Sequence, residues 1–167
     1  DSNGQMKFPY GIARNENKIA VADTDNNRIQ IFKINNDNSF TWLAKYGLVG
    51  SGDGQFNKPA GIAFANNKIY IADTENNRIQ ILRLNDDNSF TWLGKFGLQG
   101  AGDGQFRFPS GIIINGERIY VADKNNHRVQ IFKEGANETV QFLSKYGTQG
   151  DSDGQFQQPQ DIDVSGN

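Results

Sequence analysis

The chain has 167 residues, a formal net charge of −2 and no cysteine. This length is sufficient for one domain with a sizeable core. The absence of cysteine excludes disulfides, a thiolate nucleophile and zinc sites built from cysteine, and the small negative charge argues against a surface that binds phosphates through bulk positive charge.

Strand-like segments follow one another along the chain without helical periodicity, and residues 51–100 show the pattern clearly. A loop rich in Gly, Asp and Pro over residues 51–61 precedes four short segments of β-branched and aromatic residues, at 62–65, 69–72, 78–82 and 90–96. The clusters of Asn and Asp between these segments are typical of turns. Four short strands joined by tight turns predict an antiparallel meander.

The same pattern recurs at a fixed interval of 50 residues, which is kept by Pro9, Pro59, Pro109 and Pro159. A period of this size is typical of repeat architectures, in which each unit buries its faces only against its neighbours. We therefore expect an all-β propeller segment over residues 1–167, with four-stranded antiparallel blades. The repeats are 1–50, 51–100, 101–150 and a partial repeat, 151–167, that supplies the first strand of a fourth blade. Ile29, Ile31, Phe40 and Trp42 are the predicted contacts between blades.

The repeat resembles the NHL repeat. The segments that carry the resemblance are "QFNKPAGIA" at 55–63 and "IADTENNRIQIL" at 71–82, with further copies of the second at 22–30 and 122–130 and of the first at 155–164. The resemblance covers the whole chain and implies a six-bladed ring, of which this chain would be one part. Either the chain belongs to a longer protein, or half-rings associate with one another to complete the ring.

Asp and Arg flank the turn between the second and third predicted strands of each repeat, as Asp23 and Arg28, Asp73 and Arg78, and Asp123 and Arg128. These residues can face each other as a cross-strand charge pair. Asp can also accept bonds from loop N–H groups, and the Asn residues between them tolerate a left-handed conformation. We interpret the pairs as structural closures of the hairpin. The alternative is a ring of charges presented to a partner.

Asp161 and Asp163 replace the residues that correspond to Gly61 and Ala63 on the predicted innermost strand. The alternation of side chains along a strand places both carboxylates on one face. One interpretation is a divalent metal at the central channel, as in lactonase-like propellers of similar architecture. The other is that Asp161 caps a turn while Asp163 meets water. No other cofactor is expected, and His127, the only histidine, cannot build the multi-histidine metal site of NHL-related amidating lyases.

The function that we expect is a non-enzymatic binding or scaffolding module for a protein or saccharide partner, because near-identical repeats argue against an active site. One alternative is a metal-dependent hydrolase or lyase with its active site at the central channel. A second is RNA binding, which the resemblance implies for NHL domains of the TRIM type. Basic residues are spread among comparable numbers of acidic ones, so nucleic acid is disfavoured. We expect no membrane span and favour an extracellular or cell-surface location.

Overall fold

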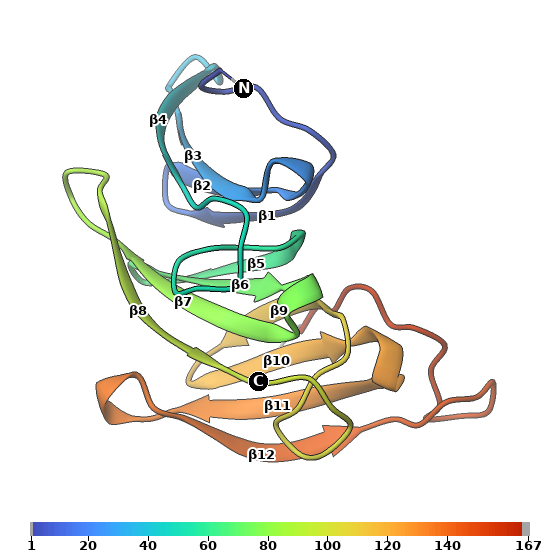
Figure 1. Ribbon diagram of the computed structural model, residues 1–167. Helices are drawn as coiled ribbons and strands as arrows, with labels where there is room; N and C mark the ends of the chain where they lie inside the picture. Colours follow the sequence, from blue (N-terminus) through green and yellow to red (C-terminus); the bar gives the residue numbers. More distant parts are fainter. Residues whose placement is uncertain (1, 165–167) are drawn as a thin grey trace.

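The computed structural model describes residues 2–164, and each full repeat in it forms one four-stranded antiparallel sheet. Within each sheet the strands are neighbours in chain order, as the predicted meander requires. The three sheets lie one against the next in chain order (Figure 1). The first sheet contains β1 (Pro9–Asn15), β2 (Lys18–Asp23), β3 (Arg28–Ile34) and β4 (Phe40–Tyr46). The second contains β5 (Pro59–Ala65), β6 (Lys68–Asp73), β7 (Arg78–Leu84) and β8 (Phe90–Phe96). The third contains β9 (Pro109–Asn115), β10 (Arg118–Asp123), β11 (Arg128–Glu134) and β12 (Val140–Tyr146).

Short 3₁₀ helices occupy the turns that the clusters of Asn and Asp predict. The turn between the second and third strands holds η1 (Thr24–Asn26), η2 (Thr74–Asn76) or η3 (Lys124–Asn126), and η4 (Ala136–Glu138) precedes β12. Asn27, Asn77 and His127 end the first three helices in the left-handed conformation, with φ of 53°, 54° and 55°. Among residues 2–164, none of these helices is long and apolar enough to cross a membrane.

The apolar core lies between the sheets, because each sheet buries its faces only against its neighbours. One cluster joins the first two sheets and includes Ile29, Ile31, Ile69 and Ile71, all with no exposed surface. An equivalent cluster joins the second and third sheets. Ile29 and Ile31 thus lie between blades as predicted. Phe40 is 60% exposed, whereas its counterpart in the second repeat packs against the first cluster.

The loops that enter the second and third repeats each contribute one phenylalanine to the junction between sheets. Phe56 and Phe106 have no exposed surface. Phe56 packs edge-on against Tyr46, with ring centroids 6.5 Å apart. A Cβ atom on Gly47 would lie 2.4 Å from the Phe56 ring, and Gly47 has a φ of +104°. Gly47 is therefore required both by the turn and by the close approach of the ring.

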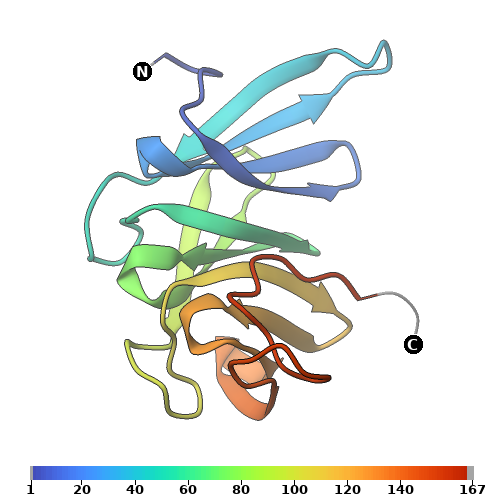
Figure 2. The ribbon, with the colours of Figure 1, turned by 90° about the vertical axis from the view of Figure 1, so that its right-hand side faces the viewer.

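The fourth repeat begins beside the third sheet but forms no β-ladder within the described residues. An isolated bridge joins Gln149 to Phe156, and the chain then runs along the third sheet (Figure 2). Residues 157–164 follow the inner strand β9 at close range, since a Cβ atom on Gly111 would lie 2.7 Å from the Cα of Asp161. A β-strand is defined by hydrogen bonds to a neighbouring strand. The second strand of this blade is absent from residues 2–164, so residues 157–164 form no ladder. Residues 165–167 lie outside the described residues.

Candidate functional site

The inner strands β1, β5 and β9 lie side by side along one wall of the space that we call the central channel, and glycine lets their backbones approach one another. An ideal Cβ atom on Gly11 would lie 2.3 Å from the carbonyl oxygen of Ala60, and one on Gly61 would lie 1.9 Å from that of Ser110. Real Cβ atoms are essentially never found closer than 3.0 Å to such an atom. The glycine at this position therefore sets how tightly the inner strands pack around the channel.

The channel contains a cavity of about 630 Å³, lined by the three inner strands and by Asp161, Ile162 and Asp163. Most of its wall is backbone and aliphatic side chains. Arg14 and Phe64 lie at corresponding positions of the first two repeats, and both line this cavity. The phenol of Tyr10 donates a hydrogen bond to Oε1 of Gln160 over 2.8 Å, which links the first inner strand to the fourth repeat.

The structure places Asp161 and Asp163 on this cavity, both exposed. Oδ1 of Asp161 accepts the backbone N–H of Ile162 at 2.9 Å, and Oδ1 of Asp163 accepts that of Val164 at 2.8 Å. Carboxylate oxygens suit Ca²⁺ or Mg²⁺, so these two residues could supply part of a coordination shell. Among residues 2–164, no three His, Cys, Asp or Glu side chains gather at one point. The metal site stays a prediction.

The Asp and Arg of each hairpin lie side by side inside the blade. Nε of Arg28 is 2.7 Å from Oδ2 of Asp23, Nε of Arg78 is 2.7 Å from Oδ2 of Asp73, and Nε of Arg128 is 2.8 Å from Oδ2 of Asp123. The three Asp side chains have no exposed surface. A charge-assisted bond of this length inside a protein is strong, and its loss would leave a buried charge without its partner.

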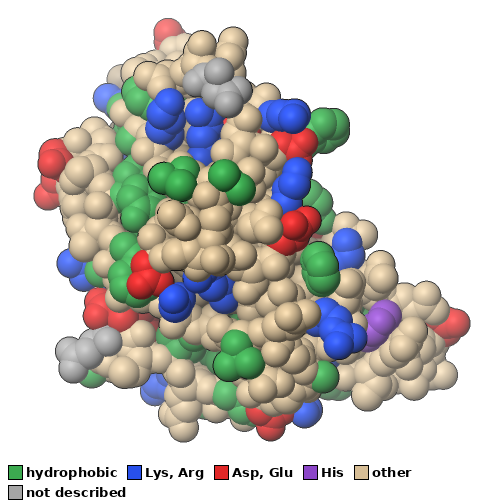
Figure 3. All heavy atoms as spheres, in the orientation of Figure 1, with side chains coloured by type: hydrophobic (Ala, Val, Ile, Leu, Met, Phe, Trp, Pro, Cys, Tyr) green, Lys and Arg blue, Asp and Glu red, His purple; other side chains and the backbone are tan. Residues whose placement is uncertain are grey.

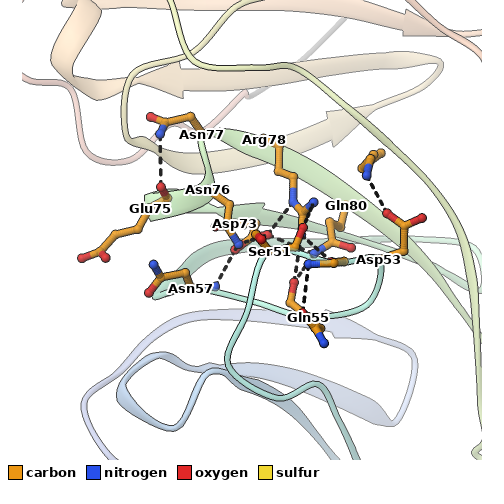
Figure 4. Close-up of polar contacts among 12 residues, drawn as sticks. Ser51, Asp53, Gln55, Asn57, Asp73, Glu75, Asn76, Asn77, Arg78 and Gln80 are labelled. Carbon is orange, nitrogen blue, oxygen red and sulfur yellow. Dashed lines mark hydrogen bonds and ion pairs between the residues drawn. The ribbon is translucent and has the colours of Figure 1, made fainter.

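The second repeat shows the full environment of one such pair (Figure 4). The guanidinium of Arg78 also donates to the carbonyl oxygens of Ser51, Gly52 and Gln55, at 2.7–3.0 Å. Oδ1 of Asp73 accepts the backbone N–H of Asn57 at 2.8 Å. These bonds fold the loop that enters the blade over the hairpin.

A buried glutamine that was not predicted from the sequence completes each of these groups. Nε2 of Gln80 donates to Oδ2 of Asp73 at 3.0 Å, and Oε1 of Gln80 accepts Nε1 of Trp92 at 3.0 Å. Gln30 and Gln130 are likewise fully buried. Each glutamine alternates with apolar residues along its strand, and this pattern is typical of a polar side chain on an exposed face. The recurrence of Gln at this position in all three repeats was the signal that it has a structural role. We name Asp73, Arg78, Gln80 and their counterparts the polar clusters.

The pKa of Asp23 reflects these bonds. Burial acts to raise the pKa of this carboxyl, but it accepts bonds from the N–H of Lys7 and from the side chains of Asn26, Arg28 and Gln30. Together these donors stabilise the charged form more than burial destabilises it, so the pKa of Asp23 lies below its ordinary value.

A second group of polar residues joins the second and third blades. Between the first two blades its lysine contact recurs, since Nζ of Lys18 donates to Oδ1 of Asn88 at 3.1 Å, whereas Ala20 and Leu84 take the places of Tyr70 and Glu134. The phenol of Tyr70, which is 1% exposed, donates to Oε2 of Glu134 at 2.6 Å. Nζ of Lys68 lies 2.9 Å from the other carboxylate oxygen of Glu134 and 3.6 Å from Glu138. Burial first, and then the bond and charge of Glu134, raise the pKa of Tyr70 well above its ordinary value. A cavity of about 230 Å³ adjoins this group.

The aspartates of the entering loops are bound within their own blades. Asp53 and Asp103 accept from Lys95 and Lys145 at 2.6 and 2.7 Å, in exposed ion pairs. His127 takes the place of a loop asparagine, and its Nδ1 accepts the backbone N–H of Gln158 at 3.2 Å. Asn27 Oδ1 accepts the N–H of Lys58 in the same way. The loop histidine thus links one repeat to the next.

Solved structures resemble this chain in fold while sharing little sequence. A protein of unknown function from Desulfotomaculum acetoxidans is 22% identical, with a TM-score of 0.66 over 85% of this chain and 43% of its own. A periplasmic gluconolactonase of Pseudomonas aeruginosa is 10% identical, with a TM-score of 0.64 over 87% and 38%. A putative 6-phosphogluconolactonase of Bacteroides fragilis is 14% identical, with a TM-score of 0.64 over 81% and 38%. This chain therefore spans about two fifths of the length of these proteins.

Among curated proteins, none matches the sequence. The family model of the NHL repeat matches residues 6–32, 56–82 and 106–132. Each match begins in the loop that enters a blade and ends in its third strand, so it contains the inner strand, the hairpin and the polar cluster. The chain belongs to the NHL-repeat β-propeller family.

Proposed function

We propose that this chain is a non-enzymatic binding module and that its partner, a protein or a saccharide, is recognised at the central channel. The observation that carries the proposal is where the near-identical repeats differ. Tyr10, Ala60, Ser110 and Gln160 correspond to one another in the four repeats, as do Arg14, Phe64 and Ile114 in the first three. Tyr10, Arg14, Phe64 and Ile114 all line the channel cavity.

The contrast with the polar clusters supports this interpretation. Asp, Arg and Gln of the polar clusters are the same in all three repeats, and they are buried and bonded within their blades. These constant residues therefore build the blade, while the variable residues Arg14, Phe64 and Ile114 line the cavity. Tyr10 presents a half-exposed ring and Arg14 an exposed guanidinium. Such groups stack on and bond to ligands with polar and apolar faces.

The test is a binding screen of the purified chain on glycan and peptide arrays, followed by calorimetry on the ligands retained. We expect Tyr10→Ala and Arg14→Ala each to weaken binding about tenfold or more, or about 1.4 kcal/mol. Lys33→Ala is the matched control, because Lys33 is exposed on β3, away from the channel. We expect Lys33→Ala to bind as the parent does. If the two channel variants also bind as the parent does, the ligand lies elsewhere and the proposal fails.

A metal-dependent hydrolase or lyase is the second candidate, favoured by the two carboxylates of Asp161 and Asp163 on the channel cavity. Two of the structures similar to this chain are described as lactonases. Calorimetric titration with Ca²⁺ or Mn²⁺ tests it: stoichiometric binding that is lost in Asp163→Ala would favour this candidate over a pure binding module.

RNA binding lacks support of this kind. On the face in Figure 3, Lys and Arg are interspersed with Asp and Glu. An RNA-binding role predicts affinity that falls steeply with salt, so a filter-binding assay at low salt is the corresponding test.

A further inference from the structure

The first blade has an apolar face that no residue of 2–164 covers. Its inner strand β1 is mostly exposed, whereas the equivalent strands β5 and β9 are mostly buried. Tyr10 is 53% exposed and Ile12 66%, and Phe40 at the far end of the sheet is 60% exposed. These side chains border an apolar groove of about 420 Å³, whose floor is formed by Ile19, Val21 and Phe32. Contiguous exposed apolar surface of this kind marks an interaction site.

The third blade has an open face on the opposite side. Leu143 is 42% exposed and Tyr146 is 60% exposed. Their counterparts in the first repeat, Leu43 and Tyr46, pack against the cluster between the first and second blades. The open face of the third blade is thus the same kind of face that the first blade presents to the second.

We propose that these two open faces bind each other between two copies of this chain, head to tail. The chain already makes this kind of junction twice, between its first and second and its second and third blades. One copy provides the face with Leu143 and the other provides the groove with Ile12. Because the two contacting surfaces differ, the contact is heterologous, and it closes only when a ring is complete. One copy matches 43% of the length of the protein from Desulfotomaculum acetoxidans. Two copies together therefore correspond to most of the length of that protein.

On the groove side, the segment that precedes β1 already has the backbone conformation that its counterparts have at the two junctions within the chain. Phe8 has a φ of 47°, close to the 52° of Lys58 and the 55° of Phe108. The N–H groups of Lys58 and Phe108 each donate to an asparagine of the preceding blade, at 2.8 and 2.9 Å. The N–H of Phe8 has no partner in the part of the chain that the structure describes. In the proposed junction it donates to His127 of the other copy.

The segment 152–164 must leave the third blade for this to happen, because the other copy's residues 2–14 take the corresponding place. This segment is held weakly. Its inner part has no ladder partner among residues 2–164, and it is held by the bonds of Gln158 to His127, of Ser110 to Pro159 and of Tyr10 to Gln160. The packing of Phe156 on Tyr146, with centroids 5.9 Å apart, is its main apolar anchor. The β1 strand of the other copy, in contrast, is hydrogen-bonded to β2 of its own blade.

Sedimentation equilibrium of the chain over a range of concentrations tests the proposal. We expect a species of twice 18.6 kDa that reverts to one chain in Ile12→Asp and also in Leu143→Asp. Both side chains are exposed, so neither change should prevent folding, which circular dichroism verifies. Leu48→Asp is the matched control, since Leu48 is 59% exposed on a loop outside both faces, and it should associate as the parent does.

The tail provides an independent readout. Phe156→Ala loosens segment 152–164, so we expect it to tighten association about tenfold or more. Hydrogen exchange of residues 157–164 should become faster in the associated form. A single-chain mass at all concentrations would overturn the proposal, and so would open-ended polymers. Loss of association in Ile12→Asp but not in Leu143→Asp would indicate contact between two identical faces, and would overturn it too.

Discussion

The contact between inner strands makes a sharp prediction for Gly61→Ala. The added Cβ atom would lie 1.9 Å from the carbonyl oxygen of Ser110, where 3.0 Å is the practical minimum. Strands β5 and β9 would have to separate by at least about 1.1 Å, and the obstructing atom is backbone rather than a flexible side chain. Overpacking of this kind costs about 1–3 kcal/mol, and we expect the upper end. For a chain of this size, that corresponds to a decrease in Tm of about 6–12 °C.

Gly94→Ala is the matched control, because a Cβ atom on Gly94 in β8 would meet nothing within 4 Å. Glycine in a strand is less stable than alanine by about 0.5–1 kcal/mol. We therefore expect Gly94→Ala to leave Tm unchanged or to raise it slightly. Thermal unfolding followed by circular dichroism measures both. If Gly61→Ala were as stable as Gly94→Ala, the inner strands would not be in backbone contact and our account of the channel would be wrong.

Three further predictions concern buried polar groups. In urea denaturation, Asp73→Ala should lower the free energy of unfolding by about 3–5 kcal/mol, whereas Asp53→Ala, in an exposed pair, should cost less than about 1 kcal/mol; equal losses would contradict the structural role. The lowered pKa of Asp23 stabilises the fold at higher pH, and this contribution is lost as the pH falls below about 4; urea titrations from pH 5 to 2 should show a shallower decline in Asp23→Asn, and an unchanged slope would refute this. Tyr70→Phe removes a buried bond to a carboxylate and should cost about 1–3 kcal/mol. Because the pKa of Tyr70 is raised, alkaline absorbance titration should show its phenolate only as the fold is lost, and ionisation of every tyrosine in the folded state would disprove that.

The fold was predictable from the sequence because its signals are local and repeated. The strand expected at residues 90–96 is β8 as observed. The strand expected at 62–65 begins earlier, at Pro59, since Pro59 pairs with Asp73 across an irregularity in the register. The proline and glycine there read as loop in the sequence. A bulge in the ladder lets both join the strand.

The polar groups were predictable only as far as they are local. Asp73 and Arg78 are five residues apart on one hairpin, so their pairing follows from the turn. The carbonyl groups that Arg78 also binds lie 23–27 residues earlier, and no local pattern predicts that loop's path. The bond of Tyr70 to Glu134 spans 64 residues and two blades. The sequence contained one signal of this bond. Tyr70 and Glu134 take the positions that Ala20 and Leu84 hold at the preceding junction, so both members of an apolar pair are replaced by polar residues.

The polar clusters have a consequence for how such a chain can grow. Asp73, Arg78, Gln80 and the carbonyl groups that they bind all come from residues 51–80 of a single repeat. The apolar clusters, by contrast, always combine residues of two repeats. A gene duplication that copies one repeat therefore copies a finished polar interior, and none of its buried charges depends on what the neighbouring repeat carries. The new unit then needs an apolar face of suitable size on either side and a loop side chain that accepts an N–H group of the next repeat, as Asn27 accepts that of Lys58.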